Sequence, residues 1–126
     1  MGVRGFGVTK EAAFEQAALA LTAVITDPSD VRQEEVVSIT CESPDDEVLL
    51  VDWLNGVIYE MATRRMLFGR YEVRIAGQHL DGEAWGEAVN PARHQPAVEV
   101  KGATYTGLRV QQGAEGTWIA ECVVDV

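Results

Sequence analysis

Residues 43–65, with the sequence SPDDEVLLVDWLNGVIYEMATRR, form the most regular pattern in the chain and decide its fold. Ser43 carries a hydroxyl typical of a helix N-cap, Pro44 suits a first turn, and acidic residues follow near the positive end of the helix dipole. Apolar residues then recur at helical spacing, namely Leu50, Trp53, Leu54, Val57, Ile58 and Met61. The stretch predicts an amphipathic helix that is capped by Ser43, ends near Arg65 and carries Asp52 on its opposite face.

A second helix is predicted upstream of this one, with Thr9 as its N-cap. The residues of its apolar face are Phe14, Ala17, Ala18, Leu21 and Ile25. The sequence Asp-Pro-Ser-Asp at 27–30 ends the helix, because proline cannot continue one. Its many alanines predict close packing against a sheet.

Most of the remaining chain alternates apolar and polar residues, which is the pattern of half-buried strands. We expect strands at residues 1–8, 31–41 and 118–126, a hairpin or meander at 67–89, a loop at 91–96 and one long strand at 98–110. This order of elements predicts an α+β fold. The expected architecture is a single domain, residues 1–126, in which antiparallel β-sheet layers pack with two main α-helices.

The composition is that of an acidic globular protein. Among the 126 residues, 10 are Lys or Arg and 20 are Asp or Glu, which gives a formal net charge of −10. This balance argues against strong nucleic-acid binding, since contacts to phosphates need clustered cations. Neither a membrane span nor an export signal is seen, so a cytoplasmic location is expected. Cys41 and Cys122 are far apart and lie in strand patterns, which favours buried free thiols.

Few residues offer catalytic chemistry. The phosphate-binding glycine motifs, the nucleophile-elbow motif and the zinc-protease motif are absent. Lys101 shares a predicted strand face with Glu99 and Tyr105, where an ion-paired surface lysine is the simplest interpretation. Asp125 precedes the carboxyl-terminal Val126, and two such carboxylates can hold Mg²⁺, Mn²⁺ or Ca²⁺ when a further donor and water complete the site. A frayed chain end is the simpler interpretation of the same residues.

The chain has two histidines, and neither lies near a cysteine in the sequence. His79 stands beside a glycine-bounded turn, which indicates a solvated turn residue. His94 lies next to Arg93 in the predicted loop, and loops carry function more often than cores do. His94 is therefore kept as a candidate functional residue.

Four segments together resemble the archease family. Residues 7–20, GVTKEAAFEQAALA, resemble its first helix, and residues 49–55, LLVDWLN, resemble its LLVDWLNEL helix. Gly86-Glu87, Asn90, Arg93-His94 and residues 99–105, EVKGATY, are similar to its G-E-x-x-D-x-x-R-H and EVKAVTY segments. The ending VVDV at 123–126 is similar to the family's C-terminal Asp-Ile or Asp-Val.

The resemblance implies an accessory protein rather than an enzyme. Archeases activate the RNA ligase that joins 3′-phosphate or cyclic-phosphate ends to 5′-hydroxyl ends in tRNA splicing and RNA repair. They promote guanylylation of the ligase and its multiple turnover, with a chaperone-like role. The family's divalent metal site uses an aspartate of an N-terminal H-T-A-D motif, the penultimate aspartate and the terminal carboxylate. By position, the resemblance makes Asp125 and Val126 metal ligands and Lys101 the accompanying base or charge.

The sequence departs from the family pattern in three places. The H-T-A-D aspartate would fall just before Met1, so either translation starts further upstream or this member lacks one ligand. With one carboxylate missing, the divalent ion (Ca²⁺, Mg²⁺ or Mn²⁺) is expected to bind weakly, because affinity follows the number of charged ligands. Asn90 stands in place of an aspartate, and Thr106 in place of a histidine or serine.

Two other functions remain open from the sequence. The first is a metal-independent chaperone or protein-interaction module, which an acidic domain with an exposed sheet face would allow. The second is a small metal-dependent hydrolase that uses Asp125 together with His94. The sequence offers no second well-placed acid–base group for such an enzyme.

Overall fold

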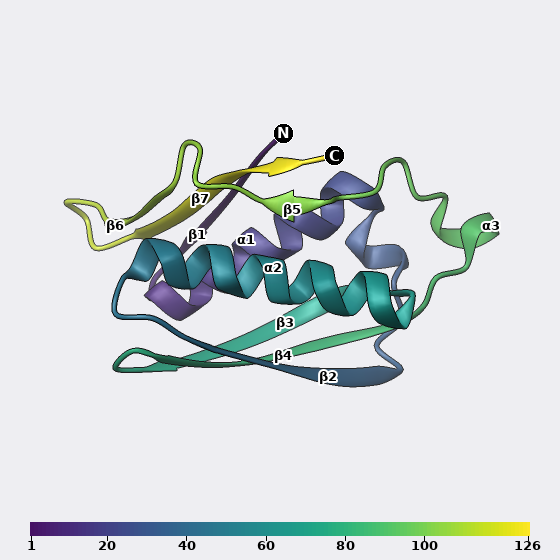
Figure 1. Cartoon of the computed structure of the whole chain (residues 1–126), viewed down its shortest axis with the longest axis horizontal. Coiled ribbons are helices and arrows are strands. Elements are labelled where there is room, and N and C mark those ends of the chain that lie inside the picture. Colours follow the sequence, from purple (N-terminus) through teal and green to yellow (C-terminus); the bar gives the residue numbers. More distant parts are fainter.

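The computed structural model describes residues 1–126 as three layers, with two helices between two antiparallel sheets (Figure 1). One sheet has the strand order β2-β4-β3, with β2 (Glu35–Glu42), β4 (His79–Ala88) and β3 (Met66–Ala76). The other is centred on β7, which pairs with β1, β5 and β6. The bounds of its strands are Gly2–Gly7 for β1, Gly102–Ala103 for β5, Arg109–Gln112 for β6 and Trp118–Asp125 for β7. The predicted α+β fold is confirmed.

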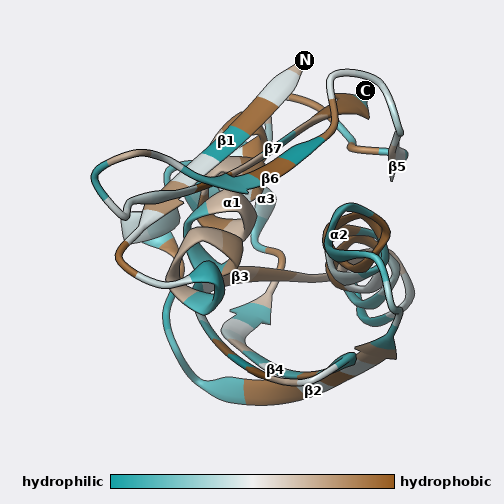
Figure 2. Cartoon of the chain, turned by 90° about the vertical axis from the view of Figure 1, so that its left-hand side faces the viewer, coloured by the Kyte–Doolittle hydropathy of each residue, from teal (hydrophilic) through white to brown (hydrophobic).

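The middle layer consists of α1 (Lys10–Ile25) and α2 (Asp46–Arg64). Figure 2 shows α2 end-on between the two sheets. The side chain of Asp45, rather than the predicted Ser43, caps α2 by accepting hydrogen bonds from the N–H groups of Glu47 and Val48. The Ser43 hydroxyl instead accepts from the N–H of Asp45, one step outside the helix. Both Ser and Asp are favoured N-cap residues, and Asp45 stands directly before the first helical residue, Asp46.

The first helix confirms the predicted cap and the predicted close packing. The Thr9 hydroxyl accepts from the N–H of Ala12. A Cβ atom on Gly5 in β1 would lie 2.3 Å from the carbonyl oxygen of Ala13, so the strand backbone rests directly on the helix. Only a residue without a side chain fits this approach.

The core joins both helices to the β2-β4-β3 sheet. The indole of Trp53 in α2 is fully buried, and its N–H donates a hydrogen bond to the carbonyl of Phe14 in α1 at 3.1 Å. The Tyr71 ring packs edge-on against Trp53, with ring centroids 5.9 Å apart. Its hydroxyl is hydrogen bonded to Thr22. These contacts satisfy the polar atoms of the largest buried side chains.

Two sequence predictions about the C-terminal half are wrong. Residues 98–110 do not form one long strand: only β5 and β6 pair with β7, and the chain turns between them, where Gly107 has a φ of 61°. Residues 91–96 contain a short helix, α3 (Pro91–His94), capped by Asn90. The predicted hairpin is confirmed as β3–β4, and a short 3₁₀ helix, η1 (Pro28–Asp30), follows α1.

The two thiols are free, as predicted. Cys122 is buried and Cys41 is half-buried. Burial raises the pKa of each thiol to about 11. No helix of the structure is both long enough and apolar enough to cross a membrane.

Candidate functional site

Lys101 and Asp125 lie side by side at the outer end of β7. The N–H of Lys101 donates a 2.7 Å hydrogen bond to the carbonyl oxygen of Asp125, and Gly102 is the register partner of Asp125. The short strand β5 therefore brings together two of the residues singled out in the sequence. Val126 follows directly and is 49% exposed.

The side chains of this pair are exposed and make no salt bridge. The other lysine of the chain, Lys10, is paired with Asp46 at 3.0 Å. The expectation that Lys101 is an ion-paired surface lysine is therefore wrong. Asp125 belongs to a hydrogen-bonded strand, so it is not part of a frayed end either.

The N-terminus lies at the same corner of the molecule (Figure 1). The N–H of Val124 donates to the carbonyl of Met1 at 2.7 Å, and β1 and β7 run antiparallel from Gly2 opposite Val123. In this register, a residue placed before Met1 would lie opposite Asp125. The strand pairing thus aims any N-terminal extension at the site.

Two polar residues that the sequence analysis did not single out hold this corner together. The side-chain oxygen of Asn55 in α2 accepts from the N–H of Ala103 at 2.8 Å, which ties β5 to the helix. The Thr104 hydroxyl donates to the carbonyl of Val123 at 2.8 Å. The signal for Asn55 was a polar residue between apolar positions of α2, but which backbone it would bind depends on the tertiary structure.

His94 lies in a different part of the molecule. It belongs to a group that we name the 87–94 clasp, formed by Glu87, Asn90, Arg93 and His94. Its ring is fully buried: Nδ1 accepts from the N–H of Asn90 at 2.8 Å, and Nε2 lies 3.0 Å from the Glu87 carboxylate. In neutral His94, the ring proton is therefore on Nε2 and is donated to Glu87.

The clasp fixes the connection after β4. Glu87 also accepts from an Arg93 guanidinium N–H and from the N–H of Arg32, and the Arg93 hydrogen bond is the main reason why its pKa falls to about 2. Thr26 at the end of α1 donates to the carbonyl of His94. The G-E-x-x-N-x-x-R-H spacing is thus explained by structure: it builds a hydrogen-bonded network around the buried side chains of Glu87 and His94.

His79 lies at the start of β4 with a half-exposed ring. A hydrogen bond to Asp81 at 3.1 Å is the main cause of its raised pKa, and Glu42 contributes further. Both partners are exposed carboxylates of the same sheet. The interpretation of His79 as a surface residue agrees with this placement.

The Lys101–Asp125 corner supplies only some of the ligands that a divalent cation needs. Asp125 and the carboxyl group of Val126 offer oxygen donors of the kind that Ca²⁺, Mg²⁺ and Mn²⁺ prefer. No three His, Cys, Asp or Glu side chains converge anywhere in residues 1–126. The donors present fit a divalent cation in type, and a complete site needs further donors.

The fold and the residues at this corner define a class of small three-layer α+β domains, and comparisons identify the family. Residues 1–126 match the Archease protein family. Protein archease of Pyrococcus furiosus is 35% identical, over 100% of this chain and 92% of its own length, and that of Methanosarcina mazei is 36% identical over 96% and 86%. The chain belongs to the archease family.

Two solved structures share the fold. Protein 1598 of Methanobacterium thermoautotrophicum superposes with a TM-score of 0.86 at 31% identity, covering 99% of this chain and 91% of its own. A Thermotoga maritima protein described as an archease and possible chaperone has a TM-score of 0.66 at 15% identity, covering 100% and 90%. The family resemblance stated from the sequence is confirmed.

Proposed function

We propose that this protein is a cytoplasmic activator of the RNA ligase that joins 3′-phosphate or cyclic-phosphate ends to 5′-hydroxyl ends in tRNA splicing and RNA repair. It promotes guanylylation of the ligase and its multiple turnover, and it is not itself an enzyme. The observation that carries the proposal is the position of Lys101 beside Asp125, both exposed and free of ion pairs.

This corner suits contact with a charged protein partner. An ammonium and a carboxylate that are already paired contribute little to a new contact, whereas Lys101 and Asp125 are available for one. The net charge of −10 speeds the approach to a cationic ligase cleft. If activation is conformational, the protein must bind one ligase state more tightly than the other.

A divalent cation is part of the proposal. Asp125 and Val126 would hold it, with Lys101 as the neighbouring positive group, and the cation would supply charge neutralisation at the partner's reacting phosphate. The incomplete donor set of residues 1–126 supports weak binding. An N-terminal extension carrying an aspartate before Met1 would place a carboxylate opposite Asp125 and strengthen the binding.

The alternative hydrolase finds no support in the contacts of its two residues. The buried ring of His94 is engaged by Glu87 and Asn90, and Asp125 lies on the exposed end of β7. A general base must come within hydrogen-bond distance of the substrate's proton, and His94 has no exposed nitrogen.

The test is guanylylation of the purified ligase with and without the wild-type protein, beside the variant Asp125→Ala. The matched control is Glu115→Ala, which removes an exposed carboxylate from the turn between β6 and β7. We expect stimulation by the wild type and the control and none by Asp125→Ala. The same assay uses the chain with a His-Thr-Ala-Asp extension, for which stimulation is expected at lower metal concentrations. The proposal is contradicted if neither the wild-type protein nor the chain with the extension stimulates the ligase.

A metal-independent chaperone is the second candidate. It is favoured by exposed apolar side chains at Phe6, Val8 and Val36, of which Val8 is 85% exposed. The Thermotoga maritima relative is described as a possible chaperone. Suppression of the aggregation of an unrelated heated enzyme, unchanged by a chelator and by Asp125→Ala, would favour this function over ligase activation.

A further inference from the structure

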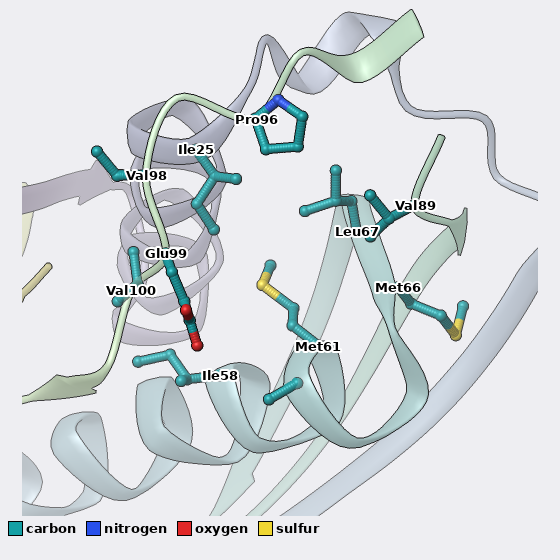
Figure 3. A pocket seen from close by; sticks show the side chains of 11 residues that line it. Ile25, Ile58, Met61, Met66, Leu67, Val89, Pro96, Val98, Glu99 and Val100 are labelled. Atoms are coloured by element: carbon teal, nitrogen blue, oxygen red, sulfur yellow. The ribbon is translucent and has the colours of Figure 1, made fainter. Parts of the chain in front are cut away.

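An apolar pocket opens beside the proposed site (Figure 3). Its volume is about 210 Å³, and it lies under residues 96–100, which we name the strap. The C-terminal half of α2 contributes Ile58, Met61 and Ala62, and the end of α1 contributes Ile25. Glu99, on the strap, is the only charged residue that lines it.

We infer that this pocket receives one apolar side chain from an extended segment of the partner protein, with a neighbouring basic residue that pairs with Glu99. The inference rests on the proposed function, because it locates a docking surface for the proposed partner. Sites for drug-sized small molecules begin near ~300 Å³, so the pocket is sized for a single anchoring side chain.

The negative charge of Glu99 is the reason for expecting a basic residue in the partner segment. Glu99 is exposed and forms no salt bridge, and Figure 3 shows its carboxylate pointing from the strap toward α2. An apolar pocket with one free carboxylate at its mouth complements an apolar residue next to Arg or Lys. A segment with an acidic neighbour would be repelled by Glu99 and by the negative protein as a whole.

The strap itself favours an extended ligand. Its main chain is hydrogen bonded at Ala97, to the carbonyl of Ile25, and again after its end, at Lys101. Between these points, residues 98–100 make no main-chain hydrogen bond. Free backbone groups beside a pocket are what an extended peptide uses for docking.

The pocket is continuous with the proposed site. A larger and more open depression, of about 360 Å³, adjoins it and shares Ile58, Ala62, Glu99 and Val100 with it. That depression adds Asn55, Tyr59 and Lys101 to its lining. A partner segment anchored in the pocket would therefore lead directly to Lys101.

The first experiment titrates the protein alone with two probes, N-acetyl-Leu-Arg-amide and N-acetyl-Leu-Glu-amide, while the NMR methyl signals of Ile25, Ile58 and Met61 are recorded. We expect the Leu-Arg probe to bind about threefold or more tightly than the Leu-Glu probe, and Glu99→Gln to remove the difference. Ala62→Leu, which fills the mouth from an exposed position, should abolish the shifts; Thr63→Leu, its neighbour outside the lining, should not. Equal binding of both probes, or no shift at all, overturns the inference.

The second experiment measures the Kd of the ligase for the same variants. We expect Ala62→Leu to weaken binding tenfold or more and Thr63→Leu to leave it unchanged. If the wild type stimulates the ligase and Ala62→Leu binds as tightly as it does, the pocket inference is wrong and the proposed function stands. If the ligase does not bind the wild type, the proposed function is wrong. The probe titration alone then shows whether the pocket binds an apolar side chain next to a basic residue. If the protein self-associates and Ala62→Leu abolishes this association, a second copy of the chain occupies the pocket. This result would also overturn the inference.

Discussion

The N–H of Lys101 donates a 2.7 Å hydrogen bond to the carbonyl of Asp125, which fixes the backbones of the two residues side by side at one exposed strand end. The bond uses only backbone atoms. It therefore leaves both charged groups free: the ammonium remains available to an acidic group of a partner, and the carboxylate to a basic group or a cation.

Removing either side chain should leave the fold intact. Lys101 and Asp125 are exposed and unpaired, so Lys101→Ala and Asp125→Ala should change the free energy of unfolding by no more than about 0.5 kcal/mol. Urea unfolding followed by tryptophan fluorescence measures this. A loss well above about 1 kcal/mol in either variant would show a structural role that the geometry does not contain.

Asn55 should position the site rather than form it. Asn55→Ala removes the acceptor for the N–H of Ala103 and should cost about 1–2 kcal/mol of stability and reduce ligase stimulation. Asn55→Asp keeps an oxygen acceptor and should restore most of both. Equal effects of the two substitutions, measured by urea unfolding and by the guanylylation assay, would exclude this hydrogen bond as the cause.

The 87–94 clasp should be a stability element. Glu87→Gln replaces a buried carboxylate that accepts from Arg93, His94 and Arg32, and we expect a loss of about 3 kcal/mol in urea unfolding at pH 7. Half-buried Glu83→Gln, which loses only its contact to Arg74, serves as control and should lose less than about 1 kcal/mol.

The same clasp predicts a pH dependence. The pKa of Glu87 falls from its ordinary 4.5 to about 2 in the folded protein. Its contribution is therefore complete above about pH 4.5 and is lost as the pH falls toward 2. The stability difference between wild type and Glu87→Gln should shrink across this window, and a difference that is constant from pH 6 to pH 2 would contradict the assignment.

The contact between β1 and α1 should tolerate no side chain. A Cβ atom on Gly5 would lie 2.3 Å from two backbone atoms of α1, so Gly5→Ala should destabilise by about 3 kcal/mol or prevent folding. Gly2 in the same strand has nothing within 4 Å of a Cβ atom, and Gly2→Ala is the matched control. Thermal unfolding of the two variants tests the difference, and equal Tm values would contradict the close packing.

Local patterns predicted most of the elements because each depends on residues near in the sequence. The two helices follow from apolar spacing and the β3–β4 hairpin from alternation. The predicted long strand at 98–110 was wrong because alternation alone does not show where pairing with β7 stops, and Gly107 turns the chain there.

The site was predicted only in part. Residue patterns singled out Lys101 and Asp125 separately, and only the family resemblance placed them in one site, because their adjacency depends on long-range register. Arg93 and His94 were expected in the loop 91–96 and Glu87 in the hairpin 67–89, but in the structure the three side chains bind one another, with Glu87 and His94 buried. A polar motif in a single sequence does not distinguish a partner contact from a buried network.

The most direct test of the central claim is a double-mutant cycle on multiple-turnover RNA joining by the ligase, with Lys101→Ala, Asp125→Ala and the double variant. If the two residues form one site, each single variant abolishes stimulation and the double variant is no worse than either. Full stimulation by both single variants, beside an active wild type, would contradict the claim that this corner activates the ligase.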